Sequence, residues 1–218
     1  MSVPWVFHFV WIGDPMPPHL AAYVASWRDV NPDWEVIVWD TERLEATLDA
    51  TLDLFERAES ITTHVGQFRS DVARYELLYR FGGVYVDCDF EARRRIDPLV
   101  VGDALLFAAW ETDDVWVNNA ILAAPPGSAV LAAVVAGLEA NVARHPHERP
   151  NVQTGPQYLT PIVREHAGQV ELWPSAWFYP YRWDELDRDG EDFPEAWAVH
   201  HWENARRRRA RRTGGPHG

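Results

Sequence analysis

Two carboxylates separated by one residue are the clearest chemical feature of this 218-residue sequence. Asp87 and Asp89 follow a short β-branched run, and we expect residues 84–90 to form one strand. Side chains two residues apart share a face of a strand, so Tyr85, Asp87 and Asp89 should point the same way. The opposite face is apolar: Val84, Val86, Cys88 and Phe90. Adjacent carboxylates repel each other, so they favour a hard cation such as Mg²⁺ or Mn²⁺, which binds one or two carboxylates together with substrate phosphates.

A helix should precede this strand and carry a second pair of charged residues. Asp71 and Arg74 are three residues apart, which makes them neighbours on the surface of a helix. One interpretation is a structural ion pair. Apolar residues lie on both sides of the pair, however, so an acid and a base that face inward favour a polar pocket. Gly82 and Gly83 then end the helix and let the chain turn sharply into the strand.

The polar positions of this stretch follow the pattern S-D-x-x-R-Y-x-x-L-Y-x-x-G-G-V-Y-x-D-x-D. The pattern resembles the Asp-x-Asp signature of glycosyltransferase family 32. That family includes yeast-type α-1,6-mannosyltransferases, α-1,4-galactosyltransferases and bacterial capsular transferases, and the glucosyltransferase domains of clostridial toxins are its relatives. Shorter similarities to the family continue along the chain in HFVWIGDPMPP, QTGPQYLTP and AWAVHHWEN.

Carried onto this chain position by position, the resemblance implies three sets of site residues. The donor-binding set comprises Trp11, Ser70, Asp71, Arg74, Tyr85, Asp87, Gly155 and Trp202. The metal ligands are Asp87, Asp89 and His200, with His201 as the alternative histidine. The catalytic set comprises Asp71, Arg74, Asp87 and Asn119. In this scheme Trp11 stacks on the nucleobase, and the backbone amides at Gly155 contact phosphate or acceptor.

The remaining chain predicts an α/β fold that places these residues. Residues 6–12 and 34–39 are expected strands, a helix over 20–29 lies between them, and Thr41 could cap the next helix. Further strands are expected within 104–109 and 120–124, followed by a helix from Ser128 to about residue 143. We therefore expect an α/β domain over residues 1–205, with a mostly parallel central sheet and flanking helices, and the family resemblance implies that it is of the GT-A type. A dinucleotide-binding Rossmann fold lacks support, because no Gly-x-Gly-x-x-Gly follows the first strand.

Composition excludes several classes of function. The formal charge of −13 argues against a general nucleic-acid binder. All 20 basic residues are arginine, which removes Schiff-base lysines and the P-loop lysine. The single cysteine, Cys88, excludes an internal disulfide. The first residues lack the basic and apolar regions of a signal peptide, so we expect a cytoplasmic protein.

The end of the chain has a different character. Residues 206–218 begin with six arginines within seven positions and end in a Gly-Gly-Pro segment, which predicts a disordered tail. The alternative is peripheral contact with the inner face of a membrane, because basic clusters bind anionic lipid.

The resemblance to family 32, together with the paired carboxylates, implies a metal-dependent, retaining glycosyltransferase that uses Mn²⁺ or Mg²⁺. Its donor would be a nucleoside-diphosphate sugar, with a UDP-sugar favoured and GDP-mannose the other choice. Its acceptor would be a saccharide, a lipid-linked sugar or a natural product, and the new bond an α-linkage. The sequence nominates no nucleophile, so the family resemblance implies front-face substitution. Two rivals remain: a non-catalytic nucleotide-sugar-binding domain, and a haloacid-dehalogenase-like phosphatase, whose motif fits less well because Glu91 stands where Thr or Val is expected.

Overall fold

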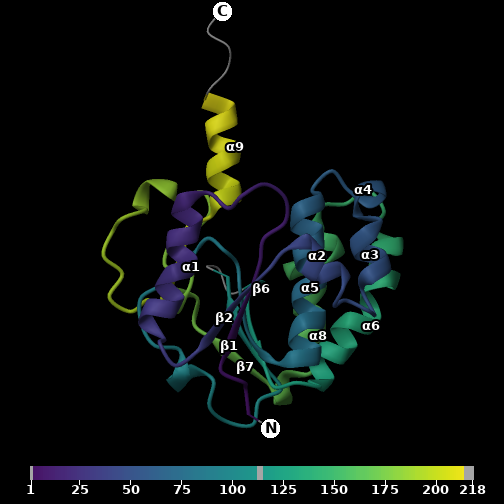
Figure 1. Cartoon of the computed structure of the whole chain (residues 1–218), viewed down its shortest axis with the longest axis horizontal. Coiled ribbons are helices and arrows are strands. Elements are labelled where there is room, and N and C mark those ends of the chain that lie inside the picture. The colour runs from purple at the N-terminus through teal and green to yellow at the C-terminus, as the bar shows by residue number, and fades with distance from the viewer. Residues whose placement is uncertain (1, 112–114, 214–218) are drawn as a thin grey trace, which may run out of the picture.

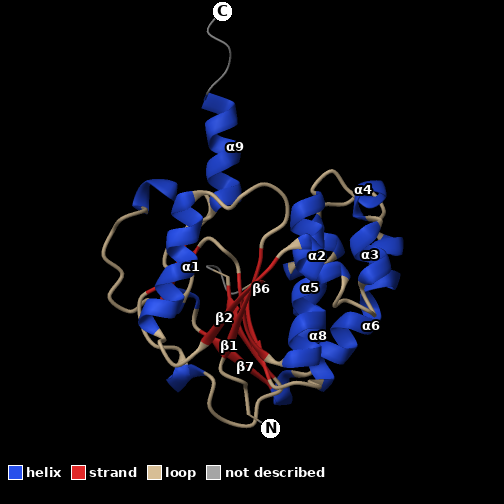
Figure 2. Cartoon of the chain, in the orientation of Figure 1, coloured by secondary structure: helices blue, strands red, loops and turns tan. Residues whose placement is uncertain are grey.

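In the computed structural model, which describes residues 2–111 and 115–213, a six-stranded sheet lies between two groups of helices (Figures 1 and 2). The strand order is β2-β1-β3-β6-β5-β7. These strands are β1 (Val6–Val10), β2 (Glu35–Trp39), β3 (Gly83–Val86), β5 (Leu106–Trp110), β6 (Val117–Ala124) and β7 (Val170–Trp173). Only β6 runs antiparallel to its neighbours, β3 and β5. The predicted α/β class with a mostly parallel sheet is confirmed.

The helices divide between the two faces of the sheet. One face carries α5 (Val65–Phe81), α6 (Ala129–Arg144) and α8 (Pro156–Glu165), with the short helices α2 (Thr41–Glu45), α3 (Leu52–Glu56), α4 (Ala58–Ile61) and α7 (Pro150–Gln153). The other face carries α1 (Pro18–Val30) and a ribbon of β4 (Phe90–Ala92) and β8 (Ala198–His200). The chain ends in α9 (Glu203–Thr213). Each face has its own buried core, so the site between the cores receives residues from both.

The predicted elements lie close to their expected positions, with one different cap. The helix expected over 20–29 is α1, and the helix that begins after Ser128 is α6, where Ser128 Oγ accepts the Leu131 amide at 3.3 Å. Asp40, and not Thr41, caps α2: its carboxylate accepts the Arg43 amide at 2.9 Å. Asp40 takes this position because its backbone is extended, whereas Thr41 already belongs to the helix.

The break between α5 and β3 requires glycine. Gly82 and Gly83 have φ angles of 65° and 95°, which are left-handed conformations. A Cβ atom at Gly83 would lie 2.6 Å from the carbonyl oxygen of Val6. This close approach lets β3 enter the sheet directly beside β1.

The strand that carries the two aspartates is shorter than predicted. β3 ends at Val86, and Asp87–Asp89 form a turn before β4. The Asp87 amide still bonds to Ala120 of β6 at 2.8 Å, but Phe90 pairs with His200 in the second ribbon. The chain therefore leaves the main sheet between the two carboxylates, where aspartate is in any case a poor strand former. The predicted alternation persists: Tyr85 lies in one core, and Val84, Val86, Cys88 and Phe90 lie in the other.

The prediction of disorder over residues 206–218 is wrong for residues 206–213, which belong to α9. Arginine is a good helix former, and two ion pairs relieve the repulsion at the start of the helix. Arg206 lies 2.7 Å from Asp189, and Arg207 lies 2.8 Å from Glu203. Residues 214–218 lie outside the part of the chain that the structure describes.

Candidate active site

Asp71 and Arg74 form the buried base of the site, on the inner side of α5. Their side chains are 2% and 3% exposed, and Arg74 Nη2 lies 3.2 Å from Asp71 Oδ1. Arg74 also donates to the carbonyl oxygens of Ser70 at 3.2 Å and Asn119 at 2.7 Å. The guanidinium is therefore fixed on several sides. Their predicted role in orienting the sugar and phosphates stays a prediction, and the structure adds that they hold each other, Asp87 and Asn119 in place.

Arg74 links this base to the first aspartate of the motif. Its Nη2 lies 3.0 Å from Asp87 Oδ1, which also accepts the Tyr85 hydroxyl at 2.7 Å. The Tyr85 ring lies under the guanidinium, 4.5 Å from its central carbon. Asp87 is thus held from behind by a cation and a hydroxyl, and its side chain remains 28% exposed.

Asn119 and two residues that the sequence did not nominate complete the base. The Asn119 amide donates to Asp71 Oδ1 at 2.9 Å from within β6, near a register irregularity between β5 and β6. Thr154 donates its hydroxyl to Asp71 Oδ2 at 2.8 Å, and Tyr75 donates to the Thr154 carbonyl at 2.7 Å. The position of Thr154 directly before the predicted Gly155 was the only signal in the sequence that could have identified it.

The second aspartate has different partners. Asp89 Oδ1 lies 3.1 Å from His200 Nε2, and Asp89 Oδ2 accepts the Glu203 amide at 2.9 Å. Trp202 makes this contact possible, because its φ of 53° is the left-handed turn that directs the first amide of α9 at the carboxylate. The Trp202 ring packs against His200 with a centroid separation of 4.2 Å.

Asp87, Asp89 and His200 each offer a ligand atom, and these atoms lie within 4.8 Å of one another. Two carboxylates and an imidazole form a donor set that suits Mn²⁺ or Mg²⁺. His200 Nε2 lies 3.1 Å from Asp89 Oδ1, so the histidine presents a ring nitrogen on the same side as the carboxylates. The predicted metal set therefore fits such an ion.

His201 does not compete for this place. Its Nδ1 lies 2.8 Å from Asp189 and its Nε2 lies 3.2 Å from Glu91. Its ring stacks on Tyr23 with centroids 4.2 Å apart. Because carboxylates occupy both ring nitrogens, the neighbouring His200 is the histidine that faces the aspartates.

The pKa values of Asp71, Asp87 and Asp89 are shifted in different directions by their surroundings. Burial raises the pKa of Asp71 to about 6, although Arg74 opposes the shift. Burial also raises the pKa of Asp87, again against Arg74, and the charge of Asp89 adds to the shift. Burial would raise the pKa of Asp89 as well, but His200 and the Glu203 amide outweigh it and lower that pKa to about 2. Asp89 is therefore the carboxylate that stays ionised most firmly.

The remaining predicted donor residues lie around this centre. Trp11 is half-buried after β1, next to Val10, whose carbonyl accepts Cys88 Sγ at 3.4 Å. Ser70 contributes its carbonyl to Arg74. The prediction that the Gly155 amide contacts phosphate or acceptor is not supported, because this amide donates to the Pro150 carbonyl at 2.7 Å and Pro156 has no N–H. Gly155 instead allows the tight turn that places Thr154 on Asp71.

Residues 17–106 match the family model described as "Glycosyltransferase sugar-binding region containing DXD motif". The chain is 26% identical over 183 residues to inositol phosphoceramide mannosyltransferase 3 of Schizosaccharomyces pombe, an alignment that covers 81% of this chain and 49% of that protein. It is 27% identical over 128 residues to mannosyl phosphorylinositol ceramide synthase SUR1 of Saccharomyces cerevisiae, covering 57% of this chain and 31% of that one. The chain spans about half the length of the first two curated relatives, and less of the synthase.

Solved structures agree on the fold. PaToxG glycosyltransferase superposes with a TM-score of 0.64 at 13% identity, covering 77% of this chain and 71% of that one. Galactosyltransferase LgtC, solved with donor and acceptor sugar analogues, superposes with a TM-score of 0.53 at 14% identity, covering 90% and 86%. The chain therefore has the GT-A fold. The matched residues include Asp71, Arg74, Asp87 and Asp89, and the match agrees with the family resemblance found in the sequence.

Proposed function

We propose that the protein transfers a hexose from a nucleoside-diphosphate sugar with retention of its α configuration, and that the transfer depends on Mn²⁺ or Mg²⁺. The observation that carries the proposal is the convergence of Asp87, Asp89 and His200 at the end of β3, directly in front of the buried Arg74. Nucleotides commonly bind at the carboxyl ends of the strands in an α/β sheet.

The chain's own residues have separate tasks in this scheme. Asp87, Asp89 and His200 would hold the ion, which when bound neutralises charge on the diphosphate leaving group. Arg74 fixes Asp87 through Oδ1 and keeps a positive charge beside the site. Asp71, Asn119 and Thr154 keep Arg74 from moving, so that the charges need no rearrangement during the transfer.

Retention is proposed to proceed by front-face substitution. A double displacement needs a carboxylate that attacks the anomeric carbon. Asp71 is fully committed to a buried network, and Asp87 and Asp89 belong to the proposed metal set. The departing phosphate is then the base that receives the acceptor proton. If the product of donor hydrolysis, read by NMR before mutarotation, were the β anomer, this part of the proposal would be wrong.

Two donors merit a direct comparison. A UDP-sugar is the donor favoured by the sequence, and one structure with this fold, a toxin domain, was solved bound to UDP. GDP-mannose is favoured by the names of the relatives, which are mannosyltransferases of inositol phosphoceramide. Those names also support a lipid headgroup hydroxyl as acceptor, ahead of the soluble saccharide.

Isothermal titration calorimetry with UDP-glucose, UDP-galactose and GDP-mannose, in Mn²⁺ and in EDTA, tests the proposal. We expect one donor to bind in Mn²⁺ only, and Asp89→Asn to abolish binding while the fold stays intact by circular dichroism. Asp103→Asn is the matched control. Asp103 is exposed in the loop before β5, which lies at the end of the sheet opposite to the carboxyl end of β3. Equal donor affinity with and without the metal would refute metal dependence. Binding without any transfer or donor hydrolysis would favour the non-catalytic rival.

The phosphatase rival makes a different prediction. It requires Asp87 to become phosphorylated, yet Asp87 Oδ1 is held by Arg74 and Tyr85. Hydrolysis of a simple phosphomonoester in the absence of nucleotide sugar would support that rival.

A further inference from the structure

The arginine-rich helix α9 is the one strongly basic element in the described part of the chain. Six of the 20 basic residues lie in it, whereas the whole chain has 33 acidic residues. Figure 1 shows α9, in yellow, projecting away from the body of the protein. The exposed arginines of this helix form a concentrated positive charge beside an otherwise acidic protein, which would attract an anionic partner.

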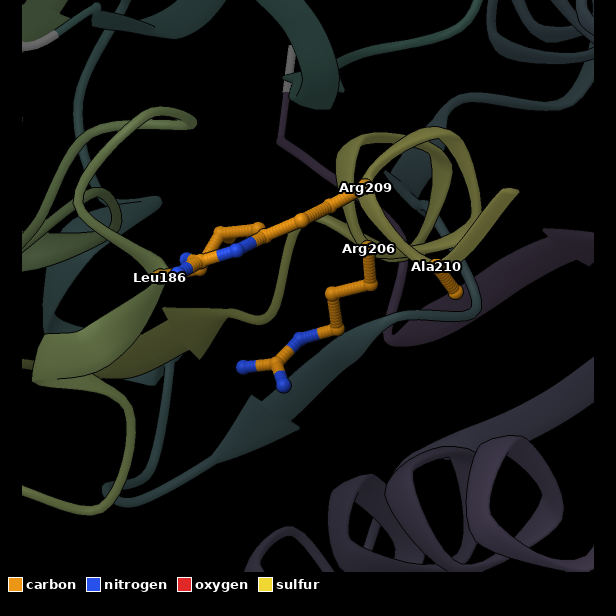
Figure 3. A pocket seen from close by; sticks show the side chains of 4 residues that line it. All are labelled: Leu186, Arg206, Arg209 and Ala210. Carbon is orange, nitrogen blue, oxygen red and sulfur yellow. The ribbon is translucent and has the colours of Figure 1, made fainter. Parts of the chain in front are cut away.

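The root of α9 is attached to the active site. The Glu203 amide donates to Asp89 Oδ2, and Arg206 donates to the His201 carbonyl at 2.6 Å. Arg206 also pairs with Asp189 at 2.7 Å. Arg206 and Arg209 line a depression of about 330 Å³ together with Leu186 and Ala210. Figure 3 shows these four side chains. Arg206 therefore holds the start of the helix on the body.

Two other arginines of the helix have a different environment. Arg208 and Arg211 are exposed, and their spacing of three places them on one side of the helix. The 11 residues of α9 extend over about 16 Å, from a rise of about 1.5 Å per residue. The Debye length at physiological salt is about 8 Å, so the far end of the helix lies largely outside the screened field of the acidic body.

We propose that α9 docks the protein on an anionic phospholipid surface, with Arg208 and Arg211 against the lipid phosphates. A flat surface suits this geometry, because the outer half of a projecting helix can reach it while most of the acidic body stays away. A nucleic acid long enough to engage several arginines would be drawn along the helix toward that body, which repels it. The acidic leaflet on the cytoplasmic side of membranes has the required charge.

Docking also sets where the active site lies. The first amide of α9, that of Glu203, bonds to Asp89. A surface that binds the far end of α9 therefore lies about one helix length, roughly 16 Å, from the proposed metal ligands. This inference rests on the proposed transfer and adds that the acceptor is a hydroxyl-bearing lipid held in that surface. A soluble donor would then reach the site from solution and the acceptor from the bilayer.

Co-sedimentation of the full chain with vesicles of phosphatidylcholine, with and without phosphatidylserine, tests the docking. We expect binding only to the anionic vesicles at low salt, and release at high salt. One basic residue near such a surface is worth about fivefold in affinity, so Arg208→Gln with Arg211→Gln should weaken binding by about 25-fold. Arg28→Gln with Arg144→Gln removes the same charge from exposed positions elsewhere and should leave binding unchanged.

Hydrolysis of the nucleotide sugar in solution keeps the two proposals apart. Arg208 and Arg211 have no part in the proposed site, so the α9 double variant should hydrolyse donor at the wild-type rate. No sedimentation with anionic vesicles, or equal loss in both double variants, would overturn the docking proposal even if donor hydrolysis is intact. Tighter binding to a single-stranded oligonucleotide than to the vesicles would overturn it as well. Docking without donor hydrolysis would instead count against the proposed transfer.

Discussion

A change of pH should reveal how His8 supports the site from a distance. His8 lies in β1 with its side chain 1% exposed. Its Nε2–H donates to the Gly82 carbonyl at 2.9 Å, and its Nδ1 accepts the Trp39 indole N–H at 3.0 Å. Both nitrogens are satisfied only while the ring is neutral, since a proton on Nδ1 would face the indole donor. The imidazole thereby fixes Gly82, from which the chain turns into the strand before Asp87.

The size of the effect follows from the pKa of this ring. Burial lowers the pKa of His8 from 6.5 to about 4, although its bond to the Gly82 carbonyl opposes the shift. Between these values the unfolded chain binds a proton that the folded chain does not, so stability falls as the pH drops through this range. At pH 5 the pH is about 1.5 units below the pKa of His8 in the unfolded chain, and each unit is worth about 1.4 kcal/mol. Protonation of the unfolded state should therefore lower the free energy of unfolding by about 2 kcal/mol between pH 7.5 and pH 5.

Urea denaturation at pH 7.5 and pH 5 measures this contribution when wild type is compared with His8→Gln. The amide of glutamine does not titrate, so the variant should lose about 2 kcal/mol less than wild type between the two pH values. The other histidines are common to both proteins and cancel in the comparison. Parallel stability profiles for the two proteins would refute the reasoning, as would an NMR titration that gives His8 a pKa near 6.5.

Two substitutions test the parts that position the aspartates. Gly83→Ala should lower the free energy of unfolding by more than about 1 kcal/mol, because φ is +95° and the new Cβ would meet the Val6 carbonyl at 2.6 Å. Gly168→Ala, which has no atom within 4 Å of the new Cβ, should leave the urea midpoint nearly unchanged, and equal effects would contradict the account. Thr154→Val removes the hydroxyl that donates to Asp71 and should cost about 1–3 kcal/mol in urea denaturation. It should also weaken donor binding, as measured by calorimetry. Wild-type stability together with wild-type affinity would show that Thr154 does not support the site.

The central motif could be predicted from sequence because its signals are local. The alternation of residues 84–90 placed the carboxylates and the core correctly, and helical spacing placed Asp71 beside Arg74. The turn at Asp87–Asp89 was not predictable in this way, since it depends on Phe90 pairing with His200 far along the chain. A periodic pattern states which side chains share a face, but it does not state where a strand changes partners.

Other features depended on tertiary contacts. The distinction between His200 and His201 needed Glu91 and Asp189, which occupy His201 from two separate segments. Thr154 reaches Asp71 across 83 positions. The run of arginines suggested disorder because like charges repel, and the acidic partners that make a helix possible, Asp189 and Glu203, could not be placed beside it from sequence.

The turn between Asp87 and Asp89 gives the two carboxylates different supports. Asp87 faces the network of Arg74 and Asp71, which belongs to the core under α5. Asp89 faces His200 and the first amide of α9, which belong to the opposite core. An ion held by both carboxylates would therefore join the two faces of the sheet at one point. The segment from His200 to Glu203 lies more than a hundred positions from Asp89 in sequence, yet it sets the charge and orientation of that residue as directly as any neighbour in the motif.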